Sequence, residues 1–183
     1  AIAILSAFSP SDKKKVYKNN AEGLKTPDKV EQLKLNRKRY KAFPKEILQF
    51  KNLKTLDLSK NKIDTIPNEI TAPTQLETLI MKSNRLDYFP ISICSLSGLK
   101  KISLAENSIV NIPSQISQLS NLEELDLYRN SIEDISPDIG KLKKLKKLDL
   151  RMIEISEEEQ DRIRALAPDT KVLTTEPCNC ASY

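Results

Sequence analysis

Histidine and tryptophan are missing from this chain of 183 residues, and glycine occurs only three times. Histidine is a common general base and the commonest metal ligand, so its absence removes the ordinary parts of a hydrolytic or metal-dependent centre. With so little glycine, neither the dinucleotide-binding nor the P-loop glycine pattern occurs. We therefore expect no enzyme, no cofactor and no metal site.

Cysteine is scarce as well, because only Cys94, Cys178 and Cys180 are present. An odd number in a chain of this length does not make a disulfide framework. Cys178 and Cys180 could form a metal-binding or redox pair, but no second pair of ligands accompanies them. Cys94 has no histidine and no obvious base as a partner, which argues against a nucleophile. The role of Cys178 and Cys180 stays open.

Long hydrophobic runs are also absent, and the most apolar stretch is Ala1–Phe8. A membrane-spanning helix needs about 20 apolar residues, so we expect a chain that does not span a membrane. Two interpretations of Ala1–Phe8 remain open. It is the end of a secretory signal, an apolar arm that packs on the domain or on a second copy, giving a monomer or a weak homo-oligomer, or both.

What the chain does have is an internal repeat with a step of 23 residues. The repeat follows the frame LxxLxLxxNxIxxIPxxIxxLxx, with five full units and the first half of a sixth. The units begin at Val30, Leu53, Leu76, Leu99, Leu122 and Leu145. The LxL core alternates with a period of two, which predicts a short strand with its leucines on one side. Stacking the units would join these strands into one parallel sheet and bury the leucines in one continuous core.

Two further columns shape the predicted turns. Asparagine follows each inner strand, where its amide can bond backbone groups that have no strand partner. We predict a structural ladder of Asn61, Asn84, Asn107 and Asn130. Proline then recurs at the start of the return path, which favours short helical or irregular turns on the convex side. In the fifth unit the proline moves one place, to Pro137 after Ser136, and predicts a local deviation.

Both ends of the repeat array look capped. Val16 and Tyr17 are expected to start a covering strand, followed by a short helix that is N-capped by Asn20 and buries Leu24. At the other end, Ser156 to Glu159 has the pattern of a capping box. The predicted organisation is an apolar and basic arm at 1–15, a cap at 16–29, six repeats at 30–155, a helix and strand cap at 156–173, and a tail at 174–183.

The repeat frame resembles leucine-rich repeat proteins, and the IPxxI stretch is similar to their bacterial and Ras-suppressor-like class. EGLKTPDKVEQLKLNRKRYKAFPKEI resembles the opening of secreted leptospiral members, and ISEEEQDRIRALAPDTKV the terminal cap of bacterial ones. The resemblance implies an α/β solenoid: a right-handed horseshoe with a parallel concave sheet. It also implies export, to the cell surface, the medium or the periplasm, and binding to a host or surface protein. The first unit departs from the frame at Lys38 and Tyr40.

The outward positions of the strands form the predicted binding surface. Tyrosine and arginine are frequent interface hot spots, and an apolar residue facing outward in mid-sheet is a further candidate contact. We predict a protein-binding site on the concave face at Ile80, Lys82, Lys101, Asp126, Tyr128, Arg129, Asp149, Arg151 and Met152. A solvated face with Asp–Arg pairs is the simpler alternative.

Two other functions remain as alternatives. The N-terminal rim is basic, with Arg39, Lys62 and Arg85 adding to the charges of the first unit, so it could bind an anionic glycan or surface. The basic run Lys141–Lys147 has no aromatic residues for base stacking, and we expect no nucleic acid as a partner. Self-assembly through Ala1–Phe8 is the second alternative.

Overall fold

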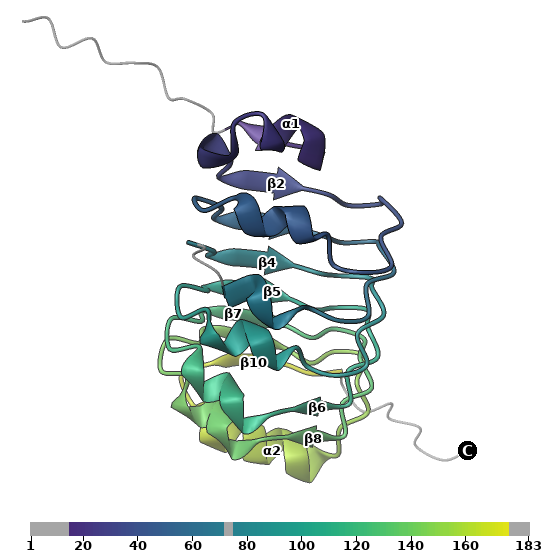
Figure 1. Cartoon of the computed structure of the whole chain (residues 1–183). Coiled ribbons are helices and arrows are strands. Elements are labelled where there is room, and N and C mark those ends of the chain that lie inside the picture. Colours follow the sequence, from purple (N-terminus) through teal and green to yellow (C-terminus); the bar gives the residue numbers. More distant parts are fainter. Residues whose placement is uncertain (1–14, 72–74, 176–183) are drawn as a thin grey trace, which may run out of the picture.

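The protein is a solenoid with a parallel sheet along one side (Figure 1), seen here in a computed structural model that describes residues 15–71 and 75–175. Eight strands follow one another in the order β1-β2-β3-β4-β5-β7-β9-β10. They are β1 Val16–Tyr17, β2 Gln32–Lys34, β3 Thr55–Asp57, β4 Thr78–Ile80, β5 Lys101–Ser103, β7 Glu124–Asp126, β9 Lys147–Asp149 and β10 Lys171–Leu173. This confirms the predicted fold class, and the sheet has a strand from each cap beyond the six repeats.

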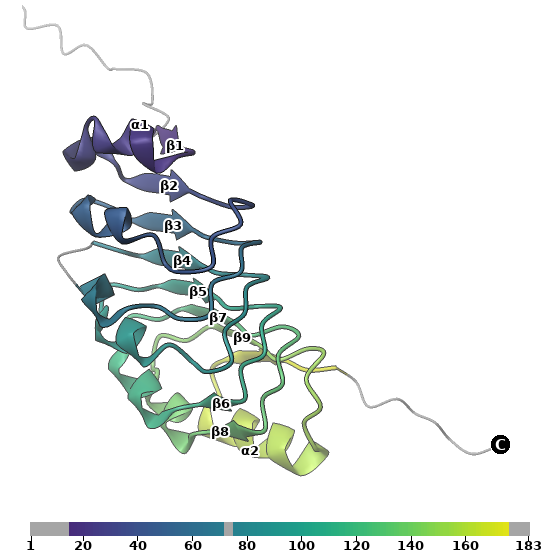
Figure 2. The same ribbon diagram turned by 45° about the vertical axis from the view of Figure 1, so that its right-hand side comes forward.

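Short 3₁₀ helices form the opposite side of each turn (Figure 2). They are η1 Pro27–Lys29, η2 Lys45–Gln49, η3 Asn68–Thr71, η4 Ile91–Ser95, η5 Ser114–Gln118 and η6 Pro137–Lys141. Pro44, Pro90 and Pro113 directly precede η2, η4 and η5 in an extended conformation, because the proline ring fixes φ there. A second parallel pair, β6 (Asn111–Ile112) with β8 (Asp134–Ile135), lies before the last two of these helices. The sequence did not predict that pair.

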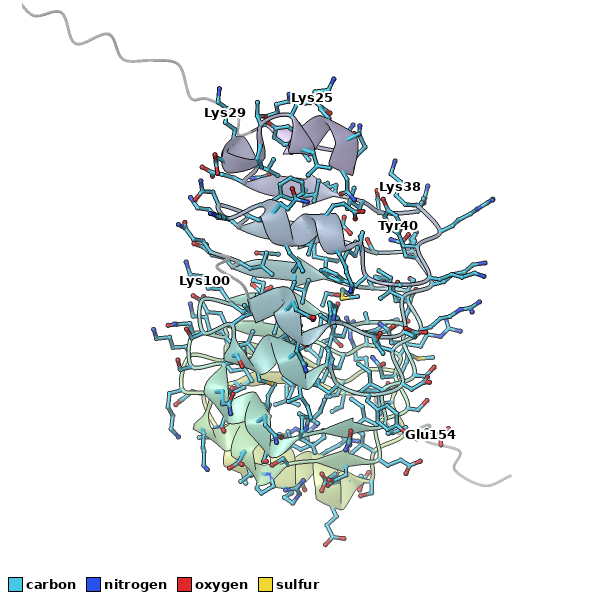
Figure 3. All side chains as sticks on the ribbon, in the orientation of Figure 1. Lys25, Lys29, Lys38, Tyr40, Lys100 and Glu154 are labelled. Carbon is cyan, nitrogen blue, oxygen red and sulfur yellow. The ribbon has the colours of Figure 1, made fainter. Side chains whose placement is uncertain are left out.

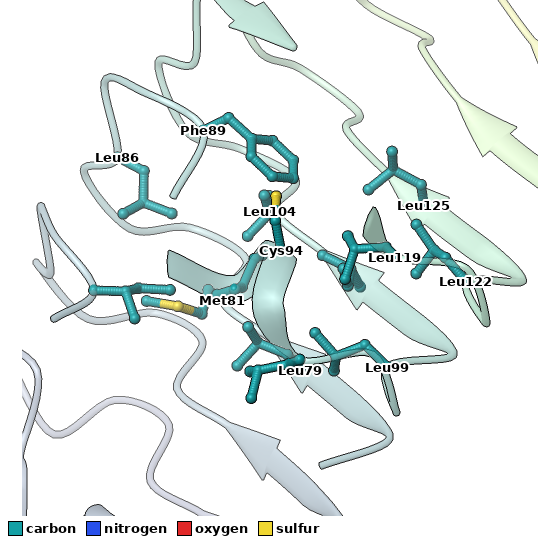
Figure 4. Packing of buried hydrophobic residues seen from close by; sticks show 14 of the residues in the cluster. Leu79, Met81, Leu86, Phe89, Cys94, Leu99, Leu104, Leu119, Leu122 and Leu125 are labelled. Carbon is teal, nitrogen blue, oxygen red and sulfur yellow. The ribbon is translucent and has the colours of Figure 1, made fainter. Parts of the chain in front are cut away.

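The register of the sheet repeats the 23-residue step. Leu33 pairs with Leu56, Leu56 with Leu79, and the series continues to Leu148. The central residue of each of these strands is at most 2% exposed. Because strand side chains alternate, the flanking positions of every strand point to the concave surface. Figure 4 shows how Leu79, Leu104 and Leu125 pack with the 3₁₀ side of the turns in one hydrophobic core.

The fifth unit adapts to its displaced proline at the expected place. Ser136 takes the position that proline has elsewhere, and its hydroxyl accepts a hydrogen bond from the Asp138 N–H at 3.2 Å. Pro137 becomes the first residue of η6, where its missing N–H costs no hydrogen bond. Ile139 remains buried like its counterparts. The deviation is therefore local.

The N-terminal cap differs from its prediction in two residues. The helix α1 (Asn20–Leu24) is capped by Asn19, whose side chain accepts a hydrogen bond from the Glu22 N–H at 2.7 Å. The prediction of Asn20 as the N-cap was therefore wrong. Leu24 is exposed rather than buried, because this helix turns Gly23 toward the core, where an added Cβ would lie 3.0 Å from the Phe50 ring.

The C-terminal cap contains the helix α2 (Glu157–Leu166), which packs beside η6. Ser156 caps it by accepting a hydrogen bond from the Glu159 N–H at 3.2 Å, as the capping-box pattern predicted. The Glu159 carboxylate does not return to the cap: it accepts two hydrogen bonds from Arg162. Arg162 also donates to the Ile135 carbonyl at 2.7 Å and so ties the cap to the last full repeat.

Several predictions lie outside the described residues. These are the arm at 1–14, including Ala1–Phe8, and Cys178 and Cys180 in the tail. Within the described part of the chain, no helix is long and apolar enough to cross a membrane.

Candidate protein-binding surface

The concave face has a hollow of about 660 Å³ across β4, β5, β7 and β9. We call this feature the concave hollow. It is lined by the outward residues of these strands and by the residues just after them. Seven of the nine predicted contact residues line it: Ile80, Lys82, Lys101, Asp126, Tyr128, Asp149 and Arg151. Stacking at a fixed register brings these residues together from four repeats.

Tyr128 lies between two cations in the concave hollow. The Lys82 Nζ is 6.0 Å from the centroid of its ring, and the guanidinium carbon of Arg151 is 5.8 Å from it. Ala105 occupies the register position between Lys82 and Tyr128 and is 1% exposed. Its short side chain leaves the space in which the lysine and the ring approach each other across β5. Each cation–π contact at such a site contributes about 0.5–1 kcal/mol.

Asp149 also holds the side chain of Arg151 in place. The Nε and Nη2 atoms of Arg151 donate hydrogen bonds of 2.9 and 2.6 Å to the two carboxylate oxygens. Burial raises the pKa of Asp149, but the hydrogen bonds and charge of Arg151 outweigh burial, and the pKa lies below its ordinary value. A carboxylate that stays ionised therefore fixes the guanidinium plane beside Tyr128.

The other charged groups of the concave hollow are also arranged in pairs. Lys101 contacts Glu124 at 2.6 Å, and that hydrogen bond raises the pKa of Lys101. Glu106 accepts hydrogen bonds from Ser83 and Lys82, which lower its pKa. The lining contains four cations, including Lys147, and four carboxylates. The concave hollow therefore has balanced charge and is not specialised for a polyanion or a polycation.

Arg129 and Met152 lie outside the concave hollow. Both have a positive φ, in a column with one such residue in each repeat: Arg37, Lys60, Ser83, Glu106, Arg129 and Met152. The chain turns out of the sheet there. Arg129 lines a shallower depression with Glu106 and Asn107, and Met152 is 56% exposed. The sequence pattern placed these two residues in the concave surface, whereas the structure places them at its rim.

The structure adds residues that the predicted site omitted, among them Ser103, Glu106, Glu124 and Lys147. The Ser103 hydroxyl donates to the Asp126 carboxylate at 2.7 Å. All four occupy outward register positions or the residue just after them. Taking every outward position of β4 to β9 and of the residues just after each strand, rather than residues chosen by type, would have found them.

The asparagine column holds the rim of the sheet together. The Asn84 amide donates to the carbonyls of Met81, at 2.9 Å, and of Leu58 in the preceding turn, at 3.0 Å, while its oxygen accepts from the Ile63 N–H. The other asparagines repeat this pattern: Asn61, Asn107 and Asn130. The side-chain oxygen of Asn61 accepts hydrogen bonds from the N–H groups of two residues of the first unit, Lys38 and Tyr40. Each strand end is therefore fixed to its neighbour.

Cys94 packs in the core, where it is 1% exposed, and burial raises its pKa to about 11. A thiol in that environment is protonated at neutral pH and does not act as a nucleophile. Among the described residues, no group of three or more cysteine, aspartate or glutamate side chains could hold a metal ion.

Comparison with known proteins agrees with this architecture. The family described as leucine-rich repeat region matches residues 30–167. A leucine-rich repeat protein of Leptospira interrogans is 31% identical, with a TM-score of 0.66 over 79% of this chain and 44% of its own. An internalin C2 of Listeria monocytogenes has 23% identity and a TM-score of 0.68 over 83% of this chain and 64% of its own.

The ectodomain of an Arabidopsis thaliana receptor kinase, solved in complex with Casparian Strip Integrity Factor 2, is 28% identical. Its TM-score is 0.61 over 87% of this chain and 19% of its own. The chain thus spans less than two thirds of each of these three structures. A search among curated proteins gave no match. The match over residues 30–167 and the parallel sheet stacked every 23 residues show that the chain belongs to the leucine-rich repeat family.

Proposed function

We propose that this protein is a non-catalytic interaction module that binds a protein partner in the concave hollow. The observation that carries the proposal is the arrangement of Tyr128 between Lys82 and Arg151, with Arg151 fixed by Asp149. Tyrosine and arginine dominate the binding energy of many interfaces. Here both are positioned in advance on a sheet, so that little side-chain freedom is lost on binding.

The charge of the concave hollow favours a protein over a highly charged polymer. Four cations and four carboxylates line it, and most of them are already paired within the chain. Such a surface gives little long-range attraction to a polyanion, but it can match the mixed polar and apolar surface of a folded protein. Ile80 and the Tyr128 ring supply the apolar contacts.

The comparisons support binding as the general role. One matched structure is a plant receptor ectodomain in complex with Casparian Strip Integrity Factor 2, and another is an internalin. From the likeness to the Leptospira interrogans protein we infer an exported bacterial protein, secreted or held at the cell surface, with the periplasm as the alternative. The inferred partner is a host or surface protein.

The test is a capture experiment with three baits. The wild type, the double variant Tyr128→Ala/Arg151→Ala and the control Tyr88→Ala are each incubated with host extracellular protein, and the captured proteins are quantified. Tyr88 is a matched control because it is 72% exposed and does not line the concave hollow. The proposal requires a partner that the wild type and the control capture and the double variant does not. A partner captured equally by all three baits contradicts it.

A further inference from the structure

Six exposed cations lie close together on the loops that follow the first three repeat strands. We call them the basic strip: Arg37, Lys38, Arg39, Lys60, Lys62 and Arg85. Figure 3 shows Lys38 on this side of the solenoid, among nitrogen-tipped side chains that project into solvent. Glu154 lies on the same side at the other end. The register position that holds Arg39, Lys62 and Arg85 in the first three repeats thus holds a carboxylate, Glu154, in the sixth.

The side chains of the basic strip have no ion-pair partner among the described residues. None of the six lies within 4.0 Å of a carboxylate there, and Asp64 and Asp87, on the same loops, are in no ion pair of the described part either. Desolvating these cations on binding would therefore break no ion pair within the described part of the chain.

The other lysine-rich surface of the chain, Lys141–Lys147, is different, because each of its lysines except Lys147 has a hydrogen-bond or ion-pair partner. Lys141 pairs with Asp138 and Lys146 with Glu123. Lys143 donates to the Gly140 carbonyl and Lys144 to the Asn121 side chain. The two basic surfaces therefore differ in whether their side chains already have partners within the described part of the chain.

The backbone of the first repeat adds one feature to the basic strip. Arg37, Arg39 and Lys60 have φ values of 59°, 60° and 57°, in the left-handed region that favours glycine and asparagine. The first repeat is unusual in having two such residues, and both are arginine. Neither side chain contributes to the core or to an ion pair among the described residues. Arg37 and Lys60 follow the column that has this φ in every repeat, so Arg39 is the one additional left-handed residue of the described chain, a cation at a position where packing does not require one.

The spacing of the cations points to a linear ligand. Arg39, Lys62 and Arg85 hold the same register position in three successive repeats. Parallel turns stack about 4.8 Å apart, so these cations form a row along the solenoid axis. We propose that the basic strip binds a linear anionic polysaccharide, whose sulfate or carboxylate groups recur along the chain and face this row. This site is separate from the concave hollow.

Two other polyanions fit less well. Single-stranded nucleic acid is bound by cations together with a series of aromatic rings that stack successive bases. In these loops Tyr88 is exposed but Tyr40 packs against the core, which leaves one ring. An anionic membrane is a plane, and a single row of loop ends offers it few simultaneous contacts. We therefore make both of these ligands arms of the test.

The experiment compares two triple variants with the wild type. Arg39→Gln/Lys62→Gln/Arg85→Gln removes three charges from the basic strip, and Lys141→Gln/Lys143→Gln/Lys144→Gln removes three from the bound lysines. Binding to heparin and to polygalacturonate is measured at three salt concentrations, and circular dichroism checks that each variant is folded. Heparin adds sulfate groups, whereas polygalacturonate has carboxylates alone, so the two probes distinguish the sources of charge.

The basic-strip variant should bind at least one polysaccharide about tenfold more weakly or worse, while the control variant keeps its affinity. Binding by the wild type should weaken steeply as salt rises. Equal loss in both variants would mean attraction by total charge and would overturn the proposal. Binding that does not depend on salt, or no binding to either polysaccharide, would also overturn it. Tighter binding to phosphatidylserine vesicles or to oligo-dT than to either polysaccharide would do the same.

Discussion

The guanidinium of Arg151 forms a bidentate hydrogen bond with the carboxylate of Asp149, with distances of 2.9 and 2.6 Å. Asp149 is 3% exposed, while Arg151 is exposed and reaches the Tyr128 ring. The pair therefore connects a buried anion to the surface of the concave hollow.

Asp149→Asn should lower the free energy of unfolding by about 1–3 kcal/mol at pH 7, because Arg151 loses a charged acceptor. The folded-state pKa of Asp149 lies below its ordinary value. The ion pair thus stabilises the fold above the unfolded-state pKa of about 4, and this contribution is lost as the pH falls through the lower folded-state pKa. Urea unfolding from pH 7 to pH 2 should show a smaller loss of stability in the variant. Parallel curves for the two proteins would contradict this account.

Asn107→Ala should destabilise the protein by about 2–4 kcal/mol, because it leaves buried backbone groups without partners. The side chain donates to the Met81 and Leu104 carbonyls and accepts from the Leu86 N–H. Asn36→Ala is the matched control, because Asn36 is exposed and its side chain makes no hydrogen bond among the described residues. Chemical denaturation of both variants is the measurement. Similar stabilities would show that the asparagine column does not hold the turns together.

Gly140→Ala should destabilise the C-terminal cap by about 1–3 kcal/mol, because the added Cβ would have to displace α2. That Cβ would lie 2.6 Å from the Leu166 carbonyl oxygen. At Gly98, the control position, a Cβ would lie 3.3 Å from the Leu76 carbonyl oxygen and needs a smaller shift. Thermal unfolding compares the two. A melting temperature that falls more for Gly98→Ala would show that α2 is not packed closely on η6.

Cys94 should resist alkylation in the native protein. It is buried, and its pKa is raised to about 11, so little thiolate is present at pH 8. In a Cys178→Ser/Cys180→Ser background, iodoacetamide should modify Cys94 only after urea unfolds the chain. Modification of the native protein at the rate of a free thiol would contradict the assigned environment and reopen a catalytic role.

The 23-residue frame predicted most of the fold because the same positions of every unit must be apolar to be buried in the shared core. Leu56, Leu79 and Leu125 point inward because side chains alternate along a strand and the stacked units bury one of the two faces. Even the displaced Pro137 predicted the position of its deviation. The caps were predicted less accurately, because Asn19 and Asn20 are equally suited to start a helix and the single turn of α1 does not repeat.

The candidate site was harder to predict than the fold. The outward positions were predictable, but the contacts among them depend on distances across strands that the sequence does not state. Nothing in the sequence marks Ala105 as part of a binding site, yet its small side chain lets Lys82 approach Tyr128. Arg129 and Met152 are outward by counting, but they lie outside the concave hollow, at the left-handed turn after the strand, whereas Glu106 at the same turn lines it. Arg162 could have been expected to pair with Glu159 from their spacing of three residues.

The central claim is that Tyr128 anchors a protein partner in the concave hollow. Its most direct test is the dissociation constant of the captured partner, measured by calorimetry for the wild type, Tyr128→Phe and Tyr128→Ala. Phenylalanine keeps the ring between Lys82 and Arg151, so its affinity should stay within about threefold of the wild type, whereas alanine should weaken binding by about thirtyfold or more. An alanine variant that binds as tightly as the wild type would contradict the account.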